Sequence, residues 1–150
     1  RSWYIFLFQI PGLPEKLLGR GDHTAMVRML QRSSSPGTFK PEDVPFYRGA
    51  WSQPGALSAM IGWYRQIIRS AARYSYRDFA FRLQMPTRIL WGEQDSAMGV
   101  ELAEQSLNWL DQGDLVRFPE ATHWVHQDLP DAVNQHILEH FSGKAVIQNS

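Results

Sequence analysis

The sequence contains no cysteine, and this absence removes several kinds of chemistry. Without thiols there is no disulfide framework, no thiolate nucleophile and no thiolate metal site. A chain without disulfides suits a reducing compartment, so we expect a cytoplasmic protein.

Net charge and long apolar runs are missing as well. The 15 basic and 15 acidic side chains cancel, which leaves no reason to expect nucleic acid or an anionic membrane surface as a partner. A bilayer span takes about 20 apolar residues, and the most apolar run, residues 3–10, is far shorter. The length of 150 residues and the 43% of hydrophobic side chains fit one ordinary globular domain with its own core. None of these features fixes an oligomeric state.

The character of the sequence changes near residue 84. Up to that point, apolar residues recur at helical spacing between short Pro, Gly and Ser clusters, which predicts an all-helical part. The run at residues 3–9 is apolar all round, as in a buried helix. Further helices are expected from Pro14, from Thr24 through Leu30, from Pro41 and over residues 56–73, with a loop at 33–37.

After residue 84, short β-like runs alternate with helical ones. We expect strands over residues 86–92 and 114–119, and helices over 101–110 and 130–141. This order is typical of a parallel sheet covered by helices, so the expected fold class is α/β, preceded by a helical part. The expected core contacts of the first helix are Leu102, Leu107 and Leu110, and the second is expected to be amphipathic, with Val133, Ile137, Leu138 and Phe141 on its apolar side.

Two strands cannot form such a sheet alone, and the chain begins with Arg1 and runs directly into apolar sequence. We therefore expect the remaining strands to lie upstream of residue 1, in a longer protein. The 150 residues by themselves would expose an unpaired strand edge and apolar faces. In that form we expect the chain to be poorly soluble and without catalytic activity.

Two polar residues stand where an α/β sheet carries its chemistry. Functional groups lie on loops just beyond the carboxyl ends of the strands, and Asp95 and His123 each follow an expected strand. Parallel strands end at the same edge of a sheet, which brings the carboxylate within hydrogen-bonding reach of the imidazole. Such a pair serves a catalytic triad, because the acid fixes the tautomer of a histidine that acts as the base.

A structural interpretation of the same residues stays open. Asp95 can cap the next helix and His123 can be an ordinary loop residue, since polar side chains are common at strand ends. His136 and His140, one helical turn apart, are a possible metal-binding pair, but the His-Glu-x-x-His arrangement is missing. We predict no metal site and no cofactor.

The residues around both positions resemble those of one family. Residues 89–95 (ILWGEQD) resemble the acid motif of epoxide hydrolases and haloalkane dehalogenases. Residues 122–130 (THWVHQDLP) resemble their histidine motif. The resemblance implies an α/β-hydrolase in which residues 1–83 form the helical cap, or lid, and residues 84–150 form the C-terminal part of the core.

The helical part resembles the lid of epoxide hydrolases in particular, at residues 8–11 (FQIP), 52–57 (SQPGAL) and 63–65 (WYR). These enzymes place two lid tyrosines over the nucleophile, and the phenols donate hydrogen bonds to the epoxide oxygen as the ring opens. The matching positions are Tyr4 and Tyr64. Without the resemblance, both would be core aromatics whose hydroxyls find a surface partner.

The nucleophile of the family, an Asp on a strand-to-helix turn, has no counterpart in this sequence. Ser58 lies among small residues, but its segment opens a helix after a loop. The resemblance implies hydrolysis of a small apolar epoxide through an Asp ester, with water activated by His123 and Asp95. A haloalkane dehalogenase and a truncated, non-catalytic hydrolase-fold remnant are the alternatives.

Overall fold

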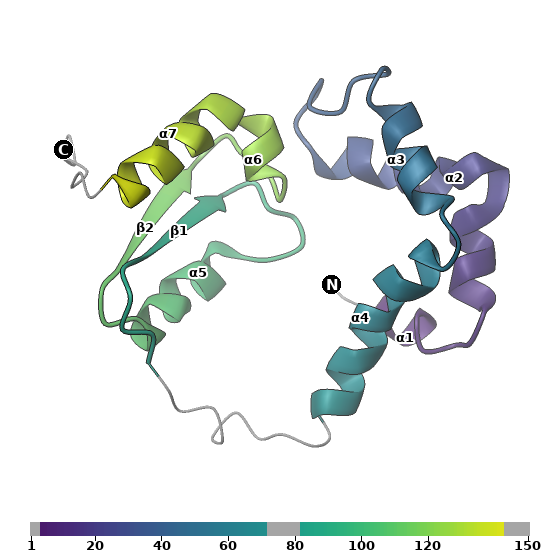
Figure 1. Ribbon diagram of the computed structural model, residues 1–150, viewed down its shortest axis with the longest axis horizontal. Helices are drawn as coiled ribbons and strands as arrows, with labels where there is room; N and C mark the ends of the chain where they lie inside the picture. Colours follow the sequence, from purple (N-terminus) through teal and green to yellow (C-terminus); the bar gives the residue numbers. More distant parts are fainter. Residues whose placement is uncertain (1–3, 72–81, 143–150) are drawn as a thin grey trace. The chain divides into compact units, whose positions relative to one another are not determined.

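The computed structural model describes residues 4–71 and 82–142, which belong to two compact units (Figure 1). Unit 1 comprises residues 1–32 and 39–80, and unit 2 comprises residues 33–38 and 81–150. Segment 33–38 thus belongs to unit 2, although the residues before and after it belong to unit 1. Within the described ranges, no helix has both the length and the apolar character needed to cross a membrane.

Unit 1 is helical, as its apolar spacing predicts. It contains α1 (Tyr4–Leu7), α2 (Leu13–Ser33, whose last residue passes into unit 2), α3 (Val44–Trp51) and α4 (Ala56–Ala71). α4 matches the helix expected over residues 56–73, of which residues 72 and 73 lie outside the described ranges. Among its described residues, the buried apolar side chains of this unit are Pro14, Met26, Leu30, Phe39, Trp51 and Ile61.

A break divides α2 into the two helices that the sequence predicts from Pro14 and from Thr24. Gly21, Asp22 and His23 all have φ between 54° and 59°. Positive φ is costly for residues with a Cβ, so Asp22 and His23 are held there by their surroundings. His23 is 6% exposed, and its Nε2 lies 3.0 Å from the hydroxyl of Ser52.

The prediction of a helix buried all round at residues 3–9 is wrong in two respects. α1 spans only four residues, Tyr4–Leu7, and residue 3 lies outside the described ranges. The side chain of Phe6 is 75% exposed. A single helical turn has one face to bury, and here that face carries Tyr4 and is continued by Phe8.

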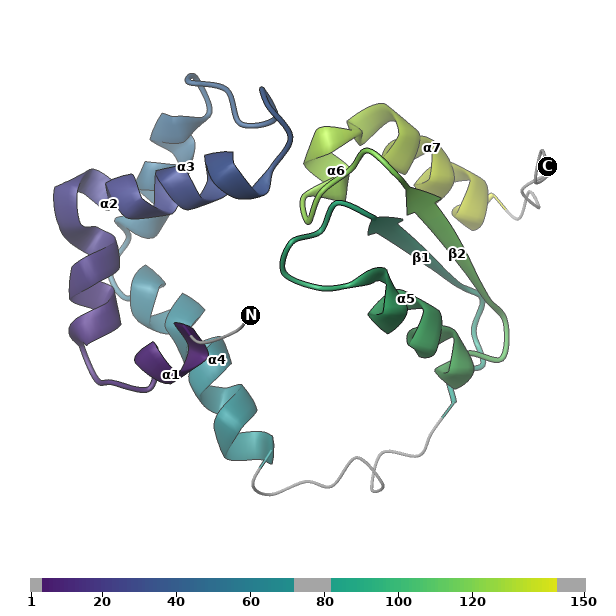
Figure 2. The same ribbon diagram turned by 180° about the vertical axis from the view of Figure 1, so that it is seen from behind.

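Unit 2 contains the predicted strand–helix–strand order. Strands β1 (Thr87–Gly92) and β2 (Gly113–Phe118) pair in parallel, with Thr87 opposite Gly113 and Gly92 opposite Phe118. Helix α5 (Val100–Ser106) and the 3-10 helix η2 (Leu107–Trp109) connect them, and the short α6 (Val125–Asp128) and then α7 (Pro130–Phe141) follow β2. Figures 1 and 2 show α5 and α7 on opposite sides of the strand pair.

The core of unit 2 is smaller than the sequence predicts. Leu110 and Val133 are buried as expected, but Leu138 is 68% exposed and Phe141 85% exposed. Leu102 and Ile137 are also exposed, and the buried position of α5 is Ala103 instead. Two strands offer each helix only a narrow apolar strip, so α5 buries a small side chain at close approach and leaves its larger ones outside.

Candidate active site

The loops that follow β1 and β2 are joined by backbone hydrogen bonds. Glu93 N–H donates to the carbonyl of Phe118 at 3.0 Å, and Gln94 N–H donates to that of Ala121 at 2.9 Å. The approach is close enough that a Cβ at Gly92 would overlap the carbonyl oxygens of Ala121 and Thr122. Glycine at the end of β1 therefore allows the acid loop to lie directly against the histidine loop.

Asp95 and His123 meet across this junction. His123 Nδ1 lies 2.8 Å from Asp95 Oδ2, so the hydrogen bond that the strand order predicts is present. The other carboxylate oxygen, Oδ1, accepts the backbone N–H groups of Ala97 at 2.7 Å and Met98 at 2.9 Å. The Asp95 side chain is 7% exposed and that of His123 41% exposed, so a buried acid supports an accessible imidazole.

The charge state of Asp95 fixes the tautomer of His123. Burial acts to raise the pKa of Asp95, but hydrogen bonds from His123 and from the N–H groups of Met98 and Ala97 outweigh it, so the pKa lies below its ordinary value. An ionised carboxylate only accepts hydrogen bonds, so Nδ1 carries the proton. The lone pair of the neutral ring is then on Nε2, which has no hydrogen-bond partner among the described residues. A histidine held in this way has the geometry that a general base requires.

A further carboxylate, that of Asp128, holds the histidine loop and was missed from the sequence. Its Oδ2 accepts the backbone N–H of Thr122 at 2.7 Å and the Thr122 hydroxyl at 2.5 Å. Thr122 directly precedes His123, so Asp128 acts on the backbone that presents the imidazole. The only available signal in the sequence was an acid shortly after the histidine, which does not by itself distinguish a structural contact from a solvated side chain.

Tyr4 and Tyr64, the two predicted lid tyrosines, lie together in unit 1. Their ring centroids are 5.7 Å apart, edge to face, and Phe8 completes the cluster at 5.5 Å from Tyr4 and 5.1 Å from Tyr64. Burial, with the charge and the hydrogen bond of Tyr4, raises the pKa of Tyr64. The Tyr64 phenol therefore keeps its proton at all ordinary pH values and can act as a hydrogen-bond donor.

Arg65 fixes the geometry of this aromatic cluster. Its guanidinium donates to the carbonyl of Phe8 through Nε at 2.8 Å and to that of Ile10 at 3.1 Å, which ties the chain after α1 to α4. It also forms a two-pronged ion pair with Glu15, at 2.8 and 3.3 Å. The hydrogen bond from Arg65 lowers the pKa of Glu15, so this carboxylate stays ionised as the anchor.

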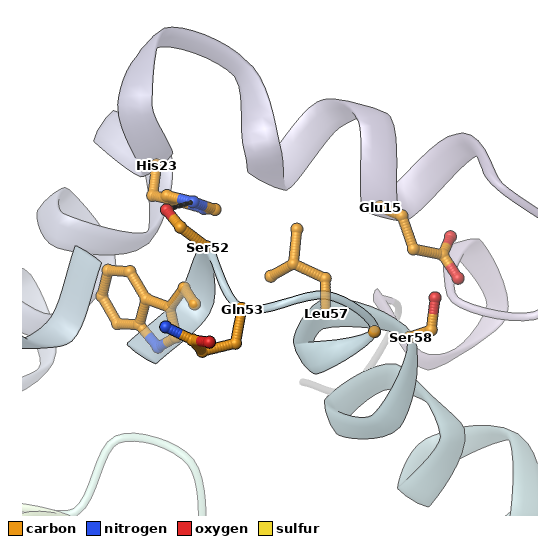
Figure 3. A pocket seen from close by; sticks show the side chains of 8 residues that line it. Glu15, His23, Ser52, Gln53, Leu57 and Ser58 are labelled. Atoms are coloured by element: carbon orange, nitrogen blue, oxygen red, sulfur yellow. Dashed lines mark hydrogen bonds between the residues drawn. The ribbon is translucent and has the colours of Figure 1, made fainter. Parts of the chain in front are cut away.

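A separate pocket of about 370 Å³ lies within unit 1 and contains none of the four predicted site residues. Figure 3 shows it between the break in α2 and the start of α4, with the side chains of Glu15, His23, Ser52 and Leu57 around it. His23 and Ser52 form a hydrogen bond with each other there. Among the described residues, no group of three His, Cys, Asp or Glu side chains could hold a metal ion, at this pocket or elsewhere.

Comparisons with known proteins give named relatives. The AB hydrolase superfamily protein YfhM of Bacillus subtilis is 36% identical over 146 residues, which are 96% of this chain and 49% of that protein. Epoxide hydrolase 1 of Caenorhabditis elegans is 36% identical over 143 residues, 91% of this chain and 34% of the relative. This chain thus spans half or less of the length of these two curated relatives.

Solved structures share the fold. An epoxide hydrolase of Bacillus megaterium has a TM-score of 0.73 at 19% identity, over 94% of this chain and 51% of that one. At that level of identity the likeness is one of fold alone. No protein-family model matches the chain.

Proposed function

Since the chain belongs to the epoxide hydrolase family of the α/β-hydrolase fold, we propose that the complete protein hydrolyses an epoxide to a vicinal diol. Residues 1–83 act as the helical lid, and residues 84–150 form the C-terminal part of the hydrolase core. The substrate is a small apolar epoxide, and neither a metal nor a cofactor takes part in the reaction.

The first step opens the ring. A carboxylate outside these 150 residues attacks an epoxide carbon, the carbon–oxygen bond breaks, and an ester forms between enzyme and substrate. The negative charge moves to the epoxide oxygen, where the phenols of Tyr4 and Tyr64 donate hydrogen bonds. The ring contact of Tyr4 with Tyr64 supports this role because it holds the two phenols together in unit 1. The raised pKa of Tyr64 supports it because that phenol keeps the proton it must donate.

The second step releases the diol. Nε2 of His123 takes a proton from water, and the resulting hydroxide attacks the ester carbonyl. The ester bond breaks, and the oxygen released from it takes the proton of the imidazolium. The carboxylic acid left on the enzyme loses its proton, which balances the proton that the oxyanion of the first step takes up, so the carboxylate is regenerated and the diol leaves. The single observation that carries this proposal is the 2.8 Å hydrogen bond from His123 to a buried Asp95, which leaves Nε2 as the basic atom.

The pairing of Tyr4 with Tyr64 favours an epoxide over a haloalkane as substrate. A halide leaving group departs from carbon and gains no stabilisation from donors aimed at an epoxide oxygen. Chloride release from chloroalkanes at a rate above that of epoxide opening would move the assignment to a dehalogenase.

The test is His123→Gln in the full-length product of the reading frame that encodes this chain, with styrene oxide as the probe epoxide. Without the base, the ester still forms but is not hydrolysed. We expect the intact-protein mass to rise by one epoxide and diol formation to fall by about 10²–10⁴-fold. His126→Gln, which changes an exposed histidine three residues away, is the matched control and should leave turnover unchanged. Normal diol formation by His123→Gln, or its loss without an adduct, would contradict the proposal.

A further inference from the structure

Asp128 lies at the end of α6, five residues beyond His123, and has no direct part in the proposed chemistry. Besides Thr122, its carboxylate binds segment 33–38. Oδ1 accepts the hydroxyl of Thr38 at 2.5 Å and the backbone N–H of Ser35 at 3.3 Å. The Asp128 side chain therefore joins the loop that carries His123 to segment 33–38. This segment belongs to unit 2, although the residues before and after it belong to unit 1.

Asp128 accepts four hydrogen bonds, from the N–H and hydroxyl of Thr122, the hydroxyl of Thr38 and the N–H of Ser35, and all four donor groups are neutral. Among the described residues, no Lys, Arg or His side chain forms an ion pair with Asp128. Burial acts to raise the pKa of Asp128, but the hydrogen bonds from Thr122, Thr38 and Ser35 outweigh it and lower the pKa. The ionised carboxylate only accepts hydrogen bonds, so its orientation is determined by where its donors lie.

The backbone is held on both sides of His123. The N–H of Thr122, before it, donates to Asp128. The N–H of Trp124, after it, donates to the Thr122 hydroxyl at 3.3 Å, and that hydroxyl in turn donates to Asp128. The Trp124 indole also donates to the hydroxyl of Ser33 at 2.8 Å, which is a further contact with segment 33–38.

We propose that Asp128 is a positioning residue for His123, which fixes the backbone on both sides of the histidine and ties it to segment 33–38. Its effect is to keep Nδ1 on Asp95 while Nε2 is aimed at the water that hydrolyses the ester. This inference rests on the proposed function. Because an error of about 1 Å in the placement of a catalytic group can cost about 10²-fold in rate, a distant anchor of this kind has a measurable effect.

The first test is Asp128→Asn in the full-length protein. The NH₂ group of the amide cannot accept the hydrogen bonds of the carboxylate oxygen that it replaces. The hydrogen bonds either to Thr122 or to Thr38 and Ser35 are therefore lost. We expect kcat to fall about 10- to 100-fold, KM to fall with it, and kcat/KM to stay within about twofold of wild type, since kcat/KM reports only the steps up to ester formation. The ester should then accumulate during turnover, and its burst amplitude counts the folded active sites.

Controls separate positioning from folding. Asp131→Asn removes a charge three residues further on, from the exposed first turn of α7, and should change neither constant. Asp128→Glu keeps all acceptor sites and should retain more of kcat than the amide does. If Asp128→Asn lowers kcat and kcat/KM by the same factor, or causes no accumulation of ester, the positioning role is overturned.

Thr38→Val isolates the contact with segment 33–38, because it removes one hydroxyl donor and leaves Asp128 intact. We expect a smaller effect of the same kind, a lower kcat at unchanged kcat/KM. Thr87→Val, at the start of β1, removes a hydroxyl whose one hydrogen-bond partner among the described residues is the carbonyl of Met85, and it is the matched control. Equal kinetics of Thr38→Val and wild type would show that segment 33–38 has no part in positioning His123.

An ester that forms in His123→Gln but not in Asp128→Asn would refute this inference alone, whereas its absence from both variants would refute the proposed function.

Discussion

At the scale of single residues, the direction of the hydrogen bonds around Asp95 decides what His123 can do. One oxygen of Asp95 is occupied by two backbone N–H groups, those of Ala97 and Met98, and the other by the imidazole. The carboxylate cannot rotate without losing both backbone donors. Since each contact requires Asp95 to accept, the geometry holds only for the ionised acid, which its lowered pKa maintains at working pH.

This arrangement predicts the effect of Asp95→Asn. The amide oxygen will stay with the two backbone N–H groups, which turns the NH₂ towards His123 and makes Nδ1 an acceptor. The proton then resides on Nε2, which can no longer take one from water. We expect the rate of ester hydrolysis to fall by about 10³–10⁴-fold, and the ¹⁵N spectrum of the His123 ring to change from the Nδ1–H to the Nε2–H tautomer. An unchanged tautomer together with full activity would contradict this assignment.

At the scale of elements, the tyrosine pair depends on α1 and α4 being joined. α1 is a single turn, too short to be stable alone, and Arg65 of α4 holds the chain that follows it through the carbonyls of Phe8 and Ile10. The carboxylate of Glu15 fixes the other side of the guanidinium. The two phenols are therefore positioned by a polar anchor adjacent to them, in addition to the contacts of their own rings.

Removal of the Tyr64 or the Tyr4 phenol should slow ring opening, whereas the role proposed for Asp128 concerns hydrolysis of the ester. Tyr64→Phe keeps the aromatic packing and loses one donor to the epoxide oxygen. We expect kcat/KM to fall by about 10²-fold, with no accumulation of ester, because ring opening becomes limiting. Tyr4→Phe should behave in the same way. Tyr47→Phe, in α3 of the same unit, is the control and should leave kcat/KM unchanged; an equal loss there would point to packing instead of catalysis.

How far the sequence predicts these elements depends on the distance between interacting residues. The helical spacing of apolar residues and the Gly and Pro residues at strand ends are local patterns. The strand–helix–strand order and the break before Thr24 follow from them. The pairing of Asp95 with His123 also follows, because parallel strands end at one edge. The exposure of Leu138 and Phe141 does not follow, since an amphipathic pattern marks a face and cannot say how much of it a two-stranded sheet covers.

The supporting residues escaped prediction for the same reason. Asp128 reaches Thr38 across 90 positions, and Arg65 reaches Glu15 across 50. The periodicity of apolar residues does not indicate such contacts, because all four of these residues are polar. From its neighbours in the sequence, each of them looks the same as a solvated surface residue. What the sequence conveys is which residue types stand at strand ends; what holds them in place becomes visible only in the fold.

At the scale of the whole molecule, the two candidate groups belong to different units. Asp95 and His123 are in unit 2, and the phenols of Tyr4 and Tyr64 are in unit 1. The chain spans 49% of the Bacillus subtilis relative and 34% of the Caenorhabditis elegans one. The activity is therefore proposed for the complete protein, and the proposal places the carboxylate that forms the ester outside these 150 residues.

The origin of the oxygen atom in the product tests this central claim most directly. A single turnover is run in H₂¹⁸O, with the full-length protein in excess over styrene oxide, and the diol is analysed by mass spectrometry. If the enzyme carboxylate attacks the epoxide and water then attacks the ester carbonyl, the oxygen added in the first turnover comes from the protein, and the diol contains no ¹⁸O. A diol that carries ¹⁸O from the first turnover would show that water attacks the epoxide directly, and the ester mechanism would be wrong.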